Sequence, residues 1–236
     1  MSQPDREPAE VAARMERGVP LPDGPGERYA GYGVLGVSFR SGDVLALRRF
    51  PVTSNCCGYT SVWHRGRDGH WTFYSDVVAE KGCQRHFGPA VSQTVVAPIR
   101  IEWTGARSLE IAVAGGRLLA WSLVLAPTAA TRLLNELARL MPARCWTNER
   151  MLAAVAAVAR LALRAGPLRL SGLTPTGSRF VSSPQALWSV ADSRATIQGR
   201  DLGRMGSIGA QHALGEFLIP RRPLFAVETS FTVMPP

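Results

Sequence analysis

The segment from Gly58 to Asp76 gathers aromatic and polar side chains of the kinds that line ligand sites. Its centre, Asp68-Gly69, is a strong signal for a two-residue type I′ turn between two strands. With those residues as the loop, Trp63 pairs with Tyr74 across the hairpin. One face then carries residues of mixed chemistry that point the same way: Tyr59, Ser61, Trp63, Tyr74 and Asp76.

This face has the chemistry of a cavity wall, with large rings for packing and polar groups to orient a ligand. Asp76 and Tyr74 are the candidate acid or base if the site is catalytic. An enclosed carboxylate needs a cation, because its pKa otherwise rises and it takes up a proton. Arg194, in the segment "ADSRA" at a predicted strand end, supplies that cation. The predicted ligand-binding residues are Tyr59, Ser61, Trp63, Arg194 and Asp192.

Two alternatives for this hairpin are also compatible with the sequence. In the first, the face with Tyr59 is merely exposed, and the opposite face with Val62 and Phe73 forms the core. In the second, a three-residue loop with a bulge at Gly69 shifts the register and exchanges the faces of the second strand.

Other short motifs do not predict a cofactor or a metal. The glycines of "GYGVLG" have dinucleotide-fingerprint spacing, but a strand pattern runs through them where a helix must begin. Cys83 and His86 have zinc-like spacing, yet the adjacent Cys56 and Cys57 are poorly placed to complete a tetrahedral set. We therefore expect buried thiols, no metal and no cofactor.

The formal charge of +9 does not indicate a nucleic-acid partner. Lys81 is the only lysine, and the arginines are scattered without a basic run. The first residues contain no apolar secretory segment, and no apolar run is long enough to span a bilayer. Cysteines in such a chain are expected to be reduced thiols, so the predicted compartment is the cytoplasm.

The elements that must position these residues are mostly strands. Short strands at even spacing, joined by Gly-bearing turns, occupy about 32–125 and 168–234. The expected fold class is mainly β (α+β): an antiparallel meander that closes into a barrel or a bent sandwich. Residues 1–28 are expected to be a loosely ordered arm, and 29–236 a single β-rich domain with a helical insertion at about 127–165.

The helical insertion has an apolar stripe that includes Leu137 and Val155, with arginines around it. We expect the stripe to pack on the sheet, since amphipathic helices usually bury that side. The alternatives are a lid, a peripheral membrane contact without a membrane span, or the interface of a homodimer.

The strand pattern, with the segments "SVWHR", "WTFYSD" and "LWSVADSRA", resembles the lipocalin-like (calycin-type) barrel proteins of bacteria, which include carotenoid-hydratase-like proteins and barrel cyclases. A mid-sized barrel can enclose one ligand, and the aromatic residues and arginines supply apolar walls and partners for an anion. The expected function is therefore an intracellular protein that binds a lipophilic small molecule carrying a polar or anionic group. An alternative is an enzyme of the same shape, such as a hydratase, isomerase or cyclase. A further alternative is an oligomeric interaction protein that uses the helical pair.

Overall fold

The computed structural model describes residues 7–21, 23–55, 57–142, 145–146, 148–206 and 211–234, without the side chains of positions 228 and 229. The strands are β1 (Glu27–Ser38), β2 (Val44–Thr53), β3 (Cys57–Arg65), β4 (Trp71–Ser75), β5 (Gln93–Val96), β6 (Ile99–Trp103), β7 (Ser108–Val113), β8 (Leu119–Ala126), β9 (Ser171–Leu173), β10 (Arg179–Ser183), β11 (Ala186–Ile197), β12 (Arg200–Asp201), β13 (Ala213–Leu214), β14 (Phe217–Leu218) and β15 (Leu224–Met234). The helices are α1 (Pro8–Glu16), α2 (Gln84–Phe87), α3 (Ala129–Leu140) and α4 (Glu149–Leu163), with short 3-10 turns η1 (Ala79–Lys81), η2 (Gly88–Ala90) and η3 (Ala114–Gly116).

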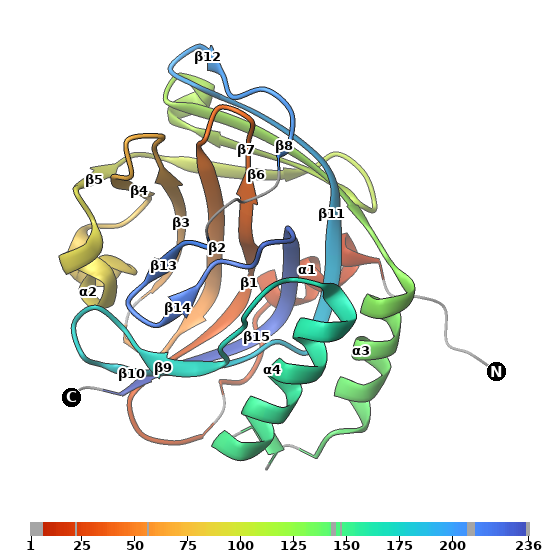
Figure 1. Ribbon diagram of the computed structural model, residues 1–236. Helices are drawn as coiled ribbons and strands as arrows, with labels where there is room; N and C mark the ends of the chain where they lie inside the picture. Colours follow the sequence, from red (N-terminus) through yellow and green to blue (C-terminus); the bar gives the residue numbers. More distant parts are fainter. Residues whose placement is uncertain are drawn as a thin grey trace.

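The protein is mainly β, and its large sheet curls strongly into a half-barrel, as the predicted fold class requires (Figure 1). Neighbouring strands follow the order β5-β4-β3-β2-β1-β15-β11-β8-β7-β6, with β9, β10 and β12 attached to this path. The last strand of the chain, β15, therefore joins the first meander to the second. One pair departs from the expected antiparallel pattern: β4 and β5 run parallel, because η1, α2 and η2 carry the chain back between them.

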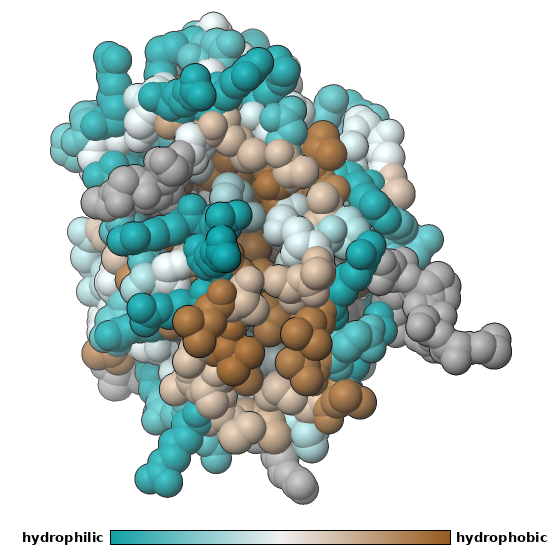
Figure 2. Space-filling model, turned by 45° about the vertical axis from the view of Figure 1, so that its right-hand side comes forward, coloured by the Kyte–Doolittle hydropathy of each residue, from teal (hydrophilic) through white to brown (hydrophobic). Residues whose placement is uncertain are grey.

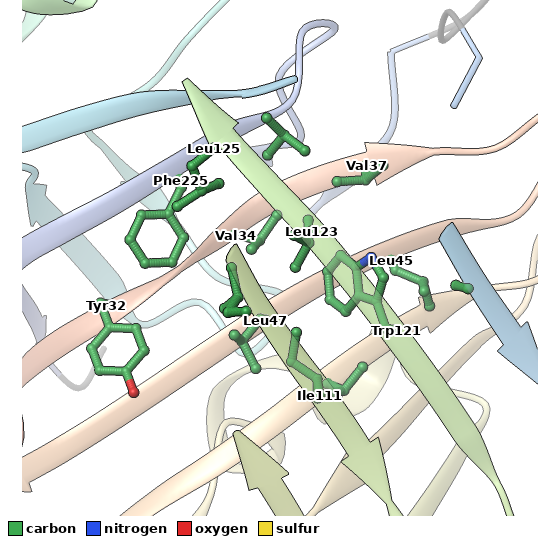
Figure 3. Close-up of a cluster of buried hydrophobic side chains, with 14 of the residues drawn as sticks. Tyr32, Val34, Val37, Leu45, Leu47, Ile111, Trp121, Leu123, Leu125 and Phe225 are labelled. Carbon is green, nitrogen blue, oxygen red and sulfur yellow. The ribbon is translucent and has the colours of Figure 1, made fainter. Parts of the chain in front are cut away.

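The central strands β1 and β2 are buried on both faces, which explains their nearly continuous apolar sequences. On one face, strands β7 and β8 cross over β1 and β2, and the side chains between them form an aliphatic cluster (Figure 3). Val34, Leu47, Ile111 and Leu123 belong to it. The other face carries an aromatic cluster, made by residues that include Tyr29, Phe50, Tyr59, Trp63, Phe73, Phe87, Phe180 and Phe217.

The predicted pairing of Trp63 with Tyr74 is wrong, because Trp63 lies opposite Phe73. The turn is the longer loop that the sequence left open: Gly69 N–H donates to Gly66 O at 2.9 Å, and Gly69 has φ +90°. This loop shifts β4 by one residue. Tyr74 consequently lies in the aliphatic cluster, while the Phe73 ring stacks on Trp63 with 4.5 Å between centroids.

The N-terminal stretch, for which the sequence predicts a loosely ordered arm, contains helix α1. Val11, Ala12 and Met15 of this helix are buried in the aliphatic cluster. The Glu16 carboxylate at its end accepts hydrogen bonds from Tyr32 and Arg49. In the structure this helix is therefore attached to the sheet by both apolar and ionic contacts.

The helical pair packs on the sheet with only part of its apolar surface. Thr128 caps α3 through a capping box, and Asn148 caps α4 by accepting from two backbone N–H groups. The Asn135 amide exchanges hydrogen bonds of 2.8 and 3.0 Å with the backbone of Leu187, which fixes α3 to β11. Leu134 and Leu152 are buried, whereas Leu137, expected to be packed, is 44 % exposed. No helix in the described ranges is long and apolar enough to cross a membrane.

Candidate functional site

A buried arginine lies at the centre of the aromatic face. Along β2, alternate side chains point to opposite faces, so Arg48 points inward with Ala46 and Phe50 while Arg49 points to the α1 side. The Arg48 guanidinium carbon lies 4.7 Å from the centroid of Trp63 and 5.1 Å from that of Phe217. Two aromatic rings therefore hold the cation by cation–π contacts.

The hydrogen bonds of Arg48 are incomplete. Its Nη1 donates to the backbone oxygens of Val34 and Leu47, each at 2.7 Å. Its Nη2 is buried and has no hydrogen-bond partner among the described residues, and no described carboxylate pairs with the guanidinium. Burial lowers the pKa of Arg48 to about 10, so the group is charged at neutral pH. A buried cation without an anionic partner is costly, and such groups are concentrated at functional sites.

Arg48 lines a cavity of about 40 Å³ that has aromatic walls. The other lining residues include Tyr29, Tyr32, Leu35, Phe50, Tyr59, Trp63, Cys83, His86, Phe87, Ser182, Phe217, Ala226 and Phe231. Within it, the Tyr59 hydroxyl and the Cys83 sulfur are 3.2 Å apart and share a hydrogen bond. Burial raises the pKa of Cys83 to about 11, so its thiol is neutral and does not supply the missing anion.

A cluster of ionisable groups lies at one wall of the cavity, where Tyr29 and His86 both contact Glu27. The Tyr29 hydroxyl donates to Glu27 Oε2, and His86 Nε2 lies 2.8 Å from the same oxygen. Burial alone would raise the pKa of Glu27, but the hydrogen bonds from Tyr29 and His86 and the charge of Arg85 outweigh it and lower the pKa. Burial and the neighbouring Glu27 carboxylate raise the pKa of Tyr29, so its hydroxyl keeps its proton.

A second pocket, about 480 Å³ in volume, lies between the helical pair and the sheet. Its lining is almost entirely apolar, with Leu134, Leu137, Trp146, Met151, Val155 and Leu163 from the helical region and Leu187 and Leu224 from the strands. Leu35, Ser182, Phe217 and Ala226 line both this pocket and the Arg48 cavity, so the two spaces are neighbours. An apolar pocket and a cavity lined by a buried cation thus lie next to each other.

The structure brings together only part of the predicted site. Tyr59 and Trp63 line the Arg48 cavity. Ser61 lies beside it, fully buried, and accepts a hydrogen bond of 3.1 Å from Trp63 Nε1. Tyr74 lies on the opposite face of the sheet. Asp76 is exposed, and its Oδ1 accepts from the backbone N–H of Thr60 at 2.7 Å, which joins the end of β4 to β3.

Asp192 and Arg194 lie elsewhere, on β11. Both are exposed, and their closest charged atoms are 3.9 Å apart. They border an open groove that also includes Glu110, Trp121 and Asp201. Arg194 is therefore not the cation of the aromatic cavity; Arg48 occupies that position.

Sequence reasoning missed Arg48, Glu27 and His86. For Arg48 the sequence does contain a signal. An arginine within the apolar strand "VLALRRF" either points away from the buried face or is itself buried, and charged side chains are rarely buried without a partner. Glu27 and His86 are brought together only by the pairing of β1 and the position of α2, so neither their types nor their spacing indicates the contact. In the described part of the chain, no three His, Cys, Asp or Glu side chains converge as metal ligands.

Comparisons with known proteins give distant structural likenesses. No protein-family model matches the chain, and no curated protein matches it. The chain is similar to a crystal structure of acetoacetate decarboxylase from Legionella pneumophila, with a TM-score of 0.39 and 11% identity, over 100% of this chain and 96% of that chain. It is also similar to a structure from structural studies of acetoacetate decarboxylase, with a TM-score of 0.43 and 8% identity, over 91% of this chain and 88% of that chain. At this level of likeness, neither the activity nor the active site of those enzymes is transferred to this chain.

Proposed function

We propose that this protein binds a lipophilic small molecule with a carboxylate or similar anionic head group. The head group binds Arg48, and the apolar tail occupies the pocket between the helical pair and the sheet. The observation that carries the proposal is the buried Arg48 guanidinium, whose Nη2 has no partner among the described residues.

The head-group site has the properties that select an anion. A carboxylate that accepts from Arg48 Nη2 would satisfy the open donor with a charge-assisted hydrogen bond, which is stronger than a neutral one. Trp63 and Phe217 restrict the guanidinium, so little of its freedom is lost on binding. The Cys83 thiol is neutral and does not compete for the cation.

The tail site accounts for the lipophilic part of the ligand. Its volume of about 480 Å³ lies within the range of small-molecule pockets. Phe217 lines both spaces, and its ring contacts the Arg48 guanidinium. A ligand with its head group on Arg48 and its tail in the apolar pocket would therefore lie against this ring.

Two measurements test this function. Native mass spectrometry of freshly purified protein should reveal a co-purifying lipophilic acid. Titration with dodecanoate and dodecanol then compares head groups on one tail, and we expect dodecanoate to bind about 30-fold more tightly, equivalent to about 2 kcal/mol. Arg48→Gln should remove this preference, whereas Arg49→Gln, its neighbour on the opposite face, should keep it. Equal affinity for the acid and the alcohol, or an unchanged preference in Arg48→Gln, would overturn the proposal.

The contacts among Glu27, Tyr29 and His86 favour a second candidate, an acid–base enzyme that acts on the same ligand. Tyr29 and His86 line the cavity that holds the Arg48 head-group site. Tyr29 retains its proton and can donate it, while the Glu27–His86 pair can accept one. Such a set would remove a proton from the carbon next to the carboxylate of a 3-alkenoic acid and return one to the far carbon of its double bond. The double bond then lies next to the carboxylate, which is the chemistry of an isomerase.

Solvent exchange tests this activity directly. Incubation with a 3-alkenoic acid in D2O should place deuterium on the carbon next to the carboxylate, as NMR would detect. Tyr29→Phe should slow this exchange at least about 100-fold, as expected for loss of a general acid. Tyr74→Phe is the matched control, since Tyr74 is buried on the other face. Exchange at the uncatalysed rate with the unmodified protein would exclude this candidate and leave the binding proposal standing.

A further inference from the structure

The helical pair exposes an apolar surface that the sheet does not cover. Of the ten large hydrophobic residues that are exposed in the described chain, six lie on α3 and α4. We name them the helical face: Leu133, Leu137, Leu140, Met151, Val158 and Leu161. Leu140 and Leu161 are each nearly four-fifths exposed, at 79 % and 78 %. In Figure 2 hydrophobic residues gather in the lower part of the surface, on the side where Figure 1 has the helical pair.

The helical face is distinct from the side that packs on the sheet. Leu133, Leu137 and Leu140 follow one another at helical spacing along α3, whereas Leu134 points to the core. On α4 the core side is Leu152, Ala156, Ala159 and Leu163. The exposed positions of α4 are also mainly apolar, namely Met151, Ala153, Ala154, Ala157, Val158, Leu161 and Ala162. A helix that is apolar on nearly all sides requires a second apolar neighbour.

The charges around the helical face are predominantly positive. Five exposed arginines belong to the two helices and the residue that caps α4: Arg132, Arg139, Arg150, Arg160 and Arg164. Only two acidic residues accompany them, and both are paired, Glu136 with Arg139 and Glu149 with Arg179. The surface thus combines exposed leucines with an excess of cations.

We propose that the helical face docks on the surface of an anionic lipid bilayer. Leucines that enter the interfacial layer and arginines that contact lipid phosphates are the combination found in peripheral membrane helices. A two-fold dimer through the same face would place this positive rim against itself, which disfavours a second copy as the occupant. Contact occurs along the helices, since none in the described ranges can cross a bilayer.

The position of the tail pocket agrees with this docking mode. Four residues of the helical face also line the pocket: Leu137, Leu140, Met151 and Val158. Docking would therefore bring the pocket against the acyl layer in which a lipophilic acid resides. Leu133 and Leu161 do not line the pocket, so the docking surface can be altered without changing the ligand site.

Vesicle co-sedimentation of the full chain tests the proposal. We expect binding to vesicles of phosphatidylcholine with phosphatidylglycerol, and at least ten-fold weaker binding to phosphatidylcholine alone. The double variant Leu133→Ser/Leu161→Ser should lose at least ten-fold in partitioning, with dodecanoate affinity and thermal unfolding unchanged. Val96→Ser/Leu173→Ser, which alters two exposed hydrophobic residues of β5 and β9, should bind vesicles as the unmodified protein does.

The charge requirement is tested separately. Arg150→Gln/Arg160→Gln should weaken binding to anionic vesicles, whereas Arg67→Gln/Arg204→Gln, with the same change in net charge, should not. Absent vesicle binding, or equal binding by the Leu133/Leu161 variant, would overturn the proposal. A protein that is dimeric in solution and becomes monomeric in that variant would also overturn it, since a second copy would then cover the helical face. The dodecanoate preference and its loss in Arg48→Gln test the ligand site alone. The ligand-binding proposal and the membrane-docking proposal can therefore be overturned independently of each other.

Discussion

Asp43 and Arg48 are both buried charges, five positions apart, and their surroundings differ in kind. Asp43 is fully buried just before β2, where Oδ1 lies 2.7 Å from His64 Nε2 and Arg200 donates to both carboxylate oxygens at 3.0 Å. Among the described residues, Arg48 donates hydrogen bonds only to two backbone carbonyls, and its buried Nη2 has no hydrogen-bond partner. Within the described part of the chain, the Asp43 carboxylate is paired with cationic groups, whereas no carboxylate pairs with the Arg48 guanidinium.

The comparison distinguishes structural burial of a charge from functional burial. A charge that is paired on every side joins elements of the fold, as Asp43 joins the start of β2 to β3 and β12. A charge left open beside a cavity costs stability and is explained best by a ligand that completes it. Variants at the two positions should therefore affect different properties: stability at Asp43 and binding at Arg48.

The largest effect on stability is expected from Asp43→Asn. This change leaves Arg200 and His64 without their anion, and breaking a buried pair in this way costs about 3 kcal/mol. Urea unfolding should show the loss as a lower midpoint with an unchanged slope. Asp23→Asn, at an exposed position, serves as the control. A decrease of less than about 1 kcal/mol in the free energy of unfolding would show that this ion cluster stabilises the fold no more than a surface ion pair does.

Acid should produce the next largest effect, through the same carboxylate. Burial alone would raise the pKa of Asp43, but hydrogen bonds from Arg200 and His64 outweigh it and lower the pKa to about 2. Because the folded pKa is below the unfolded value of about 3.9, the stabilisation is complete above pH 4 and is lost as the pH falls toward 2. The amount is about 2 kcal/mol, and unfolding measured between these pH values should show it. Asp43→Asn should abolish this part of the pH dependence; an unchanged profile would assign it to other carboxylates.

The same contrast explains what the sequence could predict. Local signals predict the main elements: α3 and α4 lie within the helical insertion expected at about 127–165, and the strands that surround the helical pair form a curled sheet. The hairpin of β3 and β4 was also found, but its register was not. The choice between loops at Gly69 depends on burial on both faces of β3, where Val62 and Trp63 are equally inaccessible to solvent.

The site itself depends on contacts that the sequence does not encode locally. Arg48 and Arg49 are adjacent and identical in type, and only the phase of β2 makes one internal and the other a partner of Glu16. The sequence predicts Tyr59 and Trp63 as neighbours because one strand carries both, and both line the Arg48 cavity. The sequence predicts Arg194 as their cation at a strand end, but Arg194 lies within β11 and borders a different pocket from Tyr59 and Trp63.

Arg48→Gln should have the smallest effect on stability, and this prediction separates the two regions most sharply. Removing the guanidinium removes the free-energy cost of burying an unpaired charge. The same burial lowers the pKa of Arg48 to about 10. The Gln amide can still donate to one of the carbonyls of Val34 and Leu47, so part of the hydrogen bonding is kept. These opposing contributions leave an expected change within about 1 kcal/mol in urea unfolding without ligand. If Arg48→Gln lowered the free energy of unfolding as much as Asp43→Asn does, Arg48 would have a structural role in joining the strands. The unpaired Nη2 would then not be evidence for a ligand. A small change in the free energy of unfolding, together with loss of the preference for dodecanoate over dodecanol, would show that Arg48 serves ligand binding and contributes little to stability.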